Sequence, residues 1–321
     1  MRRDTVGSDD SVTSRAEQSI YCFGDKPYVL EFSLMENRWE QHFIDAGSSD
    51  FKGNKQYTSI CRVGHSNKFL LTGGCAIEDN EPQSAAYRVS ISQLYQARSA
   101  AGMSQRRYGH CSVYMSGYVL VIGGYDHRNL VQATPHTLAS CEKYSPKEND
   151  WTSTSYLNVP RAFAALCKVD AETAYVFGGF CDFKTLNSIE KYNIMLDQWS
   201  LLNVKLPLKL AKLGAALSPD ARGVVIMGGL YCAEDSQTTL LNNVYKLDLE
   251  SGKWSKLPKM CSKRIHYSSV PATEDGFICI GGNFEGQCEF YDLKNKRWIE
   301  LEGYSGISYK DDLQTFSLCK F

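Results

Sequence analysis

The chain has 321 residues and a net charge of −1, and 43% of its residues are hydrophobic and 22% charged. This balance is typical of a soluble globular protein, and the lack of a sequence-wide positive charge argues against nucleic-acid binding. No apolar run approaches the roughly 18 residues that cross a membrane, and the polar start lacks the apolar core of a signal peptide. We therefore expect no membrane partner.

Residues 1–17 are polar and are predicted to form a disordered N-terminal tail, with residues 18–321 forming one repeat domain. The domain opens with an apolar segment that ends at Gly24, and a second predicted strand then leads to Trp39. The next glycine pair begins 34 residues after Trp39, whereas 27 residues separate Trp151 from Gly178. We expect the extra link, DAGSSDFKGN, to protrude.

Five apolar runs further along the chain end in pairs of glycines, and these pairs give the chain a period. The pairs are Gly73/Gly74, Gly123/Gly124, Gly178/Gly179, Gly228/Gly229 and Gly281/Gly282. Successive pairs are 50, 55, 50 and 53 residues apart. Each run is too short and too continuously apolar for a surface helix, so we predict strands buried on both faces. A fixed period of this size indicates repeated supersecondary units.

A tryptophan closes most of these units, seven residues after an aromatic or aliphatic residue. Examples are SCEKYSPKENDW (140–151), SIEKYNIMLDQW (188–199) and NVYKLDLESGKW (243–254). Glycine pairs in phase with tryptophan resemble the Kelch motif, above all the Kelch domain of BTB–Kelch (cullin adaptor) proteins. The resemblance implies an all-β fold, a six-bladed Kelch β-propeller with four antiparallel strands per blade. The segment near Gly24 is then a degenerate first repeat.

Two places in the chain depart from the repeat. In blade two the expected tryptophan slot holds Gln96, so we expect this interface between blades to be the weakest. The last repeat is cut after its first strand, TFSLCKF, which has the character of earlier inner strands such as YTSICRV. We predict that this C-terminal strand, at about residues 313–321, joins the N-terminal blade and closes the ring, so that no strand edge stays open.

The sequence shows no pattern of a catalytic site, a cofactor site or a metal site. It contains no phosphate-binding, zinc-protease or nucleophile-elbow motif, and the six histidines do not pair at metal-ligand spacing. The 12 cysteines lie mostly in apolar strands without CxxC pairs, which favours a reducing, cytoplasmic location and leaves a nuclear one open. We expect no enzyme activity and no cofactor; a metal-dependent propeller enzyme is the less favoured alternative.

Candidate ligand-binding residues stand beside the inner strands. Arg106, Arg161 and Arg264 lie 17 residues before a glycine pair, and Arg107 lies 16 before. Such arginines would form a basic rim for an acidic peptide, or they would pair with a carboxylate or carbonyls of a neighbouring blade. By resemblance to BTB–Kelch proteins, residues after the glycine pairs and at the strand entrances line a peptide-binding face. The candidates are Arg107, Tyr108, Tyr125, Arg161, Phe163, Phe180, Arg264, Tyr267 and Asn283.

The function that follows is a protein-interaction module that binds a short peptide segment, acidic if the basic rim forms. The resemblance further implies a substrate receptor of a cullin-type ubiquitin ligase, with the cullin reached only through a BTB region that these residues do not contain. A stand-alone Kelch scaffold in the cytoskeleton or in signalling is the alternative.

Overall fold

The computed structural model describes most of the chain. The described residues are 19–23, 26–33, 36–47, 51, 55–64, 66–76, 81–91, 95–126, 136–232, 237–265, 269–273, 276–280, 282, 287–303 and 317–320, with the backbone alone for 269–273 and 317–320. The tail predicted at residues 1–17 lies outside them. These residues form strands and turns without any helix, and thus no helix among them could cross a lipid bilayer.

Six four-stranded antiparallel sheets make up the fold, and each is one blade. Blade one contains β1 (Ser19–Phe23), β2 (Tyr28–Ser33), β3 (Arg38–Phe43) and β30 (Ser317–Lys320). Blade two contains β5 (Ser59–Arg62), β6 (Lys68–Thr72), β8 (Ala86–Ile91) and β9 (Tyr95–Ala100). Blade three contains β10 (Cys111–Met115), β11 (Tyr118–Ile122), β12 (Cys141–Ser145) and β13 (Asp150–Thr154).

The other three blades repeat this order. Blade four contains β14 (Ala165–Lys168), β15 (Thr173–Phe177), β18 (Ile189–Asn193) and β19 (Gln198–Leu201). Blade five contains β20 (Gly214–Leu217), β21 (Gly223–Met227), β24 (Val244–Asp248) and β25 (Trp254–Leu257), and blade six contains β26 (Ser269–Thr273), β27 (Gly276–Ile280), β28 (Cys288–Asp292) and β29 (Arg297–Leu301). Small two-stranded sheets join β4 (Lys55–Gln56) to β7 (Cys75–Ala76), β16 (Phe180–Cys181) to β17 (Lys184–Thr185), and β22 (Leu230–Cys232) to β23 (Thr238–Leu240).

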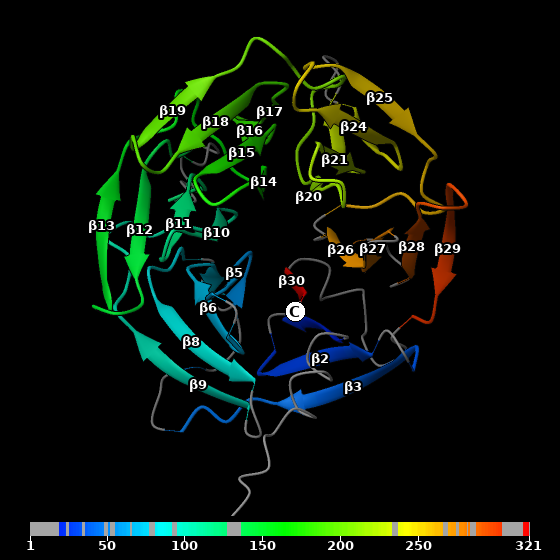
Figure 1. Ribbon diagram of the computed structural model, residues 1–321. Helices are drawn as coiled ribbons and strands as arrows, with labels where there is room; N and C mark the ends of the chain where they lie inside the picture. Colours follow the sequence, from blue (N-terminus) through cyan, green and yellow to red (C-terminus); the bar gives the residue numbers. More distant parts are fainter. Residues whose placement is uncertain are drawn as a thin grey trace, which may run out of the picture.

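The blades stand in a ring with their first strands around the centre (Figure 1). The inner strands contact each other in the cyclic order β5, β10, β14, β20, β26, β30 and back to β5. The C-terminal strand β30 pairs with β1, with Tyr21 opposite Cys319. The predicted six-bladed propeller and its closure by both ends of the chain are therefore confirmed.

The tryptophans of the repeat pack toward the preceding blade, as the pattern predicted. Trp151 of blade three contacts a cluster that includes Leu70 of blade two, and Trp199 of blade four contacts one that includes Leu120 of blade three. The indole nitrogen of Trp151 also donates a hydrogen bond to the carbonyl of Ala101 at 2.7 Å. Each blade thus covers its outer aromatic ring with its neighbour.

The link between blades one and two was expected to protrude, but its described residues, 45–47 and 51, lie against the blades, and the other link residues lie outside the described ones. Asp45 lies beside the edge strand β9, where its amide donates to the carbonyl of Tyr95 at 2.7 Å and its carbonyl accepts from Ala97 at 2.9 Å. Ala97 occupies the register position that tryptophan holds in other blades, opposite Val89. Phe51 of the link is buried in the same cluster. The link therefore packs at the seam of blades one and two, and a cavity of about 590 Å³ lies between Asp45–Gly47 and the strand residues around Ala97.

The glycine pairs sit where the next blade approaches most closely. Gly178 has a φ of +59°, and a Cβ on it would lie 2.2 Å from the carbonyl oxygen of Leu210. Its neighbour Gly179 donates a 2.8 Å hydrogen bond to the same oxygen. Any side chain at Gly178 would collide with the connection into blade five, so only glycine fits.

Candidate functional site

Three of the predicted binding residues, Arg107, Arg161 and Arg264, do not form a basic rim. Their side chains are at most 1% exposed. Arg161 donates to Glu190 at 2.6 Å and to the carbonyl of Gly178 at 2.7 Å. Burial lowers the pKa of Arg161, and the Glu190 carboxylate opposes that effect. These arginines have a structural role, as the alternative considered above allowed, but the carboxylate belongs to the third strand of the blade that each arginine enters and not to a neighbouring blade.

The same contact recurs in blades three and six and is replaced in blades two and five. Arg107 pairs with Glu142 at 2.8 Å, and Arg264 pairs with Glu289. Blade five has Leu210 and Tyr245 in the corresponding places, and blade two has Lys55, whose amine donates to the hydroxyl of Tyr87 at 3.3 Å. The residue at the arginine position of the entering connection thus changes together with its partner residue on the third strand.

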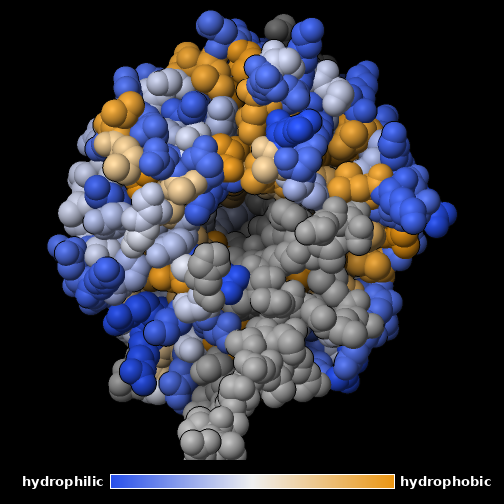
Figure 2. Space-filling view, viewed as in Figure 1, coloured by the Kyte–Doolittle hydropathy of each residue, from blue (hydrophilic) through white to orange (hydrophobic). Residues whose placement is uncertain are grey.

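Next to these connections, four residues at the starts of the inner strands form a continuous chain of backbone hydrogen bonds. Gly109 donates to Tyr57 at 3.0 Å, Phe163 to Gly109 at 2.7 Å, and Lys212 to Phe163 at 2.7 Å. All four have φ between +52° and +61°. Three of the four carry large side chains in a backbone conformation that disfavours them. Because the inner strands circle the centre, these residues lie at one mouth of the channel, and Figure 2 shows the molecule hollowed at its centre.

An aromatic cluster at this mouth is centred on Phe163. Its ring lies 5.1 Å from that of Tyr57, 5.9 Å from that of Tyr125 and 6.5 Å from that of Phe180. Tyr108 pairs with Tyr125 through two backbone hydrogen bonds of 3.0 and 2.9 Å. The residues after the glycine pairs therefore meet the strand entrances, as predicted. We call Tyr57, Tyr108, Tyr125, Phe163, Phe180 and Lys212 the mouth cluster.

Lys212 adds a positive charge to the mouth cluster. Its amine lies 5.0 Å from the centre of the Phe163 ring. Burial lowers the pKa of this amine from 10.5 to about 8, an effect that nearby Cys232 partly offsets. The amine is therefore still mostly protonated at pH 7, while its partly desolvated position strengthens its attraction for an anion.

The predicted binding residues differ in how much of their side chains is exposed to a ligand. Tyr108 and Tyr125 are buried at 6% and 5% exposure, whereas Phe163 and Phe180 are partly exposed. Tyr267 and Asn283 lie outside the described residues. Sequence reasoning missed Tyr57, which stands 16 residues before Gly73. The buried Arg107 stands equally far before Gly123, so the repeat spacing alone did not mark Tyr57 as a mouth residue.

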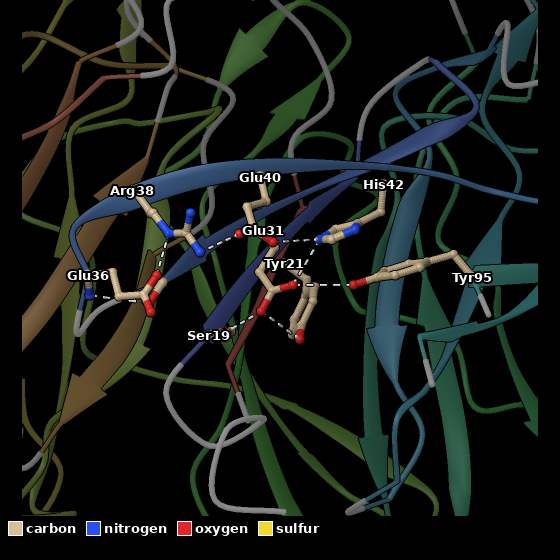
Figure 3. Close-up of polar contacts among 9 residues, drawn as sticks. Ser19, Tyr21, Glu31, Glu36, Arg38, Glu40, His42 and Tyr95 are labelled. Atoms are coloured by element: carbon tan, nitrogen blue, oxygen red, sulfur yellow. Dashed lines mark hydrogen bonds and ion pairs between the residues drawn. The ribbon is translucent and has the colours of Figure 1, made fainter. Parts of the chain in front are cut away.

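A second polar group lies at the seam of blades one and two, centred on Glu31 (Figure 3). Glu31, Glu40 and His42 bring one ligand atom each within 4.8 Å of one another. The Glu31 carboxylate accepts hydrogen bonds from Ser19 at 2.5 Å, Tyr21 at 3.1 Å and Tyr95 at 3.2 Å, and contacts His42 at 3.0 Å. The His42 ring stacks on Tyr95 at 4.3 Å. These contacts indicate that the polar group around Glu31 has a structural role and joins blade one to blade two.

The geometry defines a class of protein: a closed six-bladed β-propeller with variable side chains around its channel. The Kelch motif matches residues 106–158 and 165–203. Kelch-like protein 25 of Xenopus tropicalis is 24% identical over 313 residues, which cover 94% of this chain and 50% of that protein. β-Scruin of Limulus polyphemus is 26% identical over 184 residues, or 56% of this chain and 19% of that protein.

Two further matches agree with these. Kelch-like protein 23 of Mus musculus is 25% identical over 204 residues, which cover 61% of this chain and 33% of that protein. The solved structure of YjhT has the same fold, with a TM-score of 0.67 at 12% identity, covering 86% of this chain and 91% of that one. The chain spans half or less of the length of these curated relatives. The chain is therefore a six-bladed β-propeller that carries Kelch motifs and is similar to Kelch-like proteins.

Proposed function

We propose that this propeller is a protein-interaction module that binds a short peptide segment at the mouth cluster. The observation that carries the proposal is the partly exposed ring of Phe163, in contact with four aromatic rings and with the amine of Lys212. Aromatic side chains that anchor a partner beside a cation are typical of binding hot spots. The strained backbone of Tyr57, Phe163 and Lys212 supports a role for their side chains beyond packing.

The chemistry of the mouth cluster selects the peptide. An apolar or aromatic side chain would pack on Phe163 and Phe180, and a carboxylate two or three residues away would reach Lys212. One cation, rather than a rim of arginines, then provides the preference for an acidic residue. This arrangement favours peptides that combine one acidic and one apolar residue over peptides that are acidic throughout.

We extend the proposal to the longer protein that the curated relatives suggest. Similarity to Kelch-like proteins supports a substrate receptor of a cullin-type ubiquitin ligase, provided that a BTB region is joined to this propeller. Similarity to β-scruin supports the second candidate, a Kelch scaffold with no ligase partner. Co-purification of a cullin with the full-length protein, but not with the isolated propeller, would favour the substrate receptor over the scaffold.

The test uses a random peptide library selected on the wild-type propeller, followed by affinity measurements on the selected peptides by fluorescence polarisation. Phe163→Ala and Lys212→Gln should each weaken binding about tenfold or more. The matched controls are Phe43→Ala and Lys256→Gln, which remove an exposed ring and an exposed cation elsewhere. Selected peptides that bind both mouth variants as tightly as wild type would refute the site.

A further inference from the structure

A separate pocket of about 510 Å³ lies between blades two and three. It is at the end of the ring opposite the mouth cluster, because β6 begins there at Lys68 and reaches the glycine pair Gly73/Gly74 at its other end. The side chains that matter for its chemistry are Val63, Lys68, Arg88, Arg98, Tyr144 and Pro146.

The charged wall of this pocket carries two arginines in direct opposition. Arg88 on β8 is the register partner of Arg98 on β9, so their Cβ atoms are about 5 Å apart and their charges repel. Lys68 projects from the same face, since it pairs with Ser90, two residues from Arg88. Among the described residues no carboxylate forms an ion pair with any of these three cations, whereas Arg38 and Lys246 elsewhere do have such partners.

The other blades do not repeat this arrangement. In blades three, four and five the same row places a lysine opposite a small hydroxyl residue. These pairs are Lys143 with Thr152, Lys191 with Ser200, and Lys246 with Ser255. Two facing arginines without a counterion are thus particular to blade two among these blades, and the propeller fold does not require them.

The rest of the pocket is apolar and aromatic. Val63, which follows β5, lines it together with Tyr144 and Pro146 from the end of β12 and the turn that follows. The Tyr144 hydroxyl is already engaged, because it donates to the side chain of Asn149 at 2.7 Å. Burial raises the pKa of Tyr144, and the cation of Arg88 partly opposes that rise. A bound group would therefore meet cations on one side and apolar surface on the other.

We propose that this pocket binds a phosphate monoester carried on an apolar or aromatic group. Two guanidinium groups carried by facing residues offer several N–H donors, which suit a dianion with three acceptor oxygens. A single carboxylate would neutralise only one of the two facing charges. The apolar body of the ligand would pack against Val63 and Pro146. This site is independent of the mouth cluster and of any peptide bound there.

Isothermal titration calorimetry with phenyl phosphate tests the proposal. Arg88→Gln and Arg98→Gln should each weaken phenyl phosphate binding about tenfold, while Arg222→Gln, an exposed arginine of blade five, should not change it. Removing one of two repelling charges should also leave thermal stability equal or slightly higher, which excludes misfolding as the cause. Inorganic phosphate, which lacks the apolar body, should bind more weakly than phenyl phosphate.

Three results would contradict the proposed phosphate site. Absence of binding at millimolar phenyl phosphate, equal affinity for inorganic phosphate, or unchanged affinity in both arginine variants would each overturn the proposal. The ligand could be a phosphorylated protein segment or a free aromatic phosphate, and a phosphotyrosine tripeptide tested in parallel distinguishes these two sources. Tighter binding of the tripeptide would assign the site to a phosphorylated protein segment, and equal or weaker binding would assign it to a free aromatic phosphate.

Discussion

At the scale of single residues, position in the repeat separates two kinds of cation. Arg161 and Lys212 both carry a cation into the entrance of an inner strand. Arg161 is buried because Glu190 on the third strand, itself fully buried, offers it a partner. Lys212 stands two places further along its repeat, in the position that Phe163 holds in blade four, and its amine lies over the Phe163 ring at the mouth.

Replacing Arg161 by Leu should destabilise the propeller by roughly 3–5 kcal/mol, because Glu190 would remain buried without its counterion. The double variant Arg161→Leu with Glu190→Tyr copies the pair Leu210 and Tyr245 of blade five. It should recover most of the loss, since apolar replacement of a whole buried pair is close to neutral. Urea denaturation of the three proteins measures both effects. A single variant within 1 kcal/mol of wild type would contradict this role.

Lys212 should make stability depend on pH. Its pKa is about 8 in the folded protein against 10.5 for an ordinary lysine. Below pH 8 both states hold the proton, so the cost of burying the charge is fully present. Between about pH 8 and 10.5 only the unfolded chain holds it, so the free energy of unfolding rises with pH. Lys212→Met lacks this rise.

The measurement is urea denaturation of wild type and Lys212→Met at pH 7, 8.5 and 10. The stability advantage of the variant should be largest at pH 7 and shrink toward pH 10, and all other titrating groups cancel in the comparison. An advantage that stays constant over this range would show that Lys212 titrates normally.

At the scale of elements, the blades cohere because each outer strand buries a large ring against its neighbour. Blade two lacks the tryptophan and holds Ala97 in that register position. The link residues Ile44 and Phe51 are buried in the same cluster, and the ring of Phe51 lies 5.2 Å from that of Tyr87. A segment that looks like a loop in the sequence thus does the packing that an outer strand does in other blades.

Phe51→Ala should cost roughly 3 kcal/mol or more, and Trp199→Ala roughly 3–5 kcal/mol, because each removes a buried ring between two blades. Phe43→Ala is the control, since its ring is 73% exposed, and it should change stability by less than about 0.5 kcal/mol. Chemical denaturation ranks the three. A Phe51 variant as stable as the Phe43 variant would show that the link contributes nothing to this seam.

At the scale of the whole molecule, the ring holds together only if its two ends share one blade. Strand β30 supplies the inner strand of blade one through its pairing with β1. It also contacts β26 and β5, the inner strands on either side. The closure therefore joins the last blade to the first.

Deleting the last ten residues removes β30 and exposes the edge of β1, and the truncated chain should lose its cooperative thermal transition. Deleting residues 1–17 keeps β1 and serves as the control, which should melt at the wild-type temperature. Circular dichroism at increasing temperature measures both. If the C-terminal truncation kept its melting temperature, closure by β30 would not hold the ring together.

The sequence by itself determined the number of blades, the strands and the closure, because each repeat carries a glycine pair, a tryptophan or both at a nearly fixed spacing. The mouth cluster was partly predictable, since Tyr125 and Phe180 follow glycine pairs directly. Only the tertiary structure decided that Arg107, Arg161 and Arg264 are buried and that Phe51 packs inside. Those outcomes depend on which side chain the neighbouring strand or blade presents, and contacts between residues so far apart along the chain leave no local pattern.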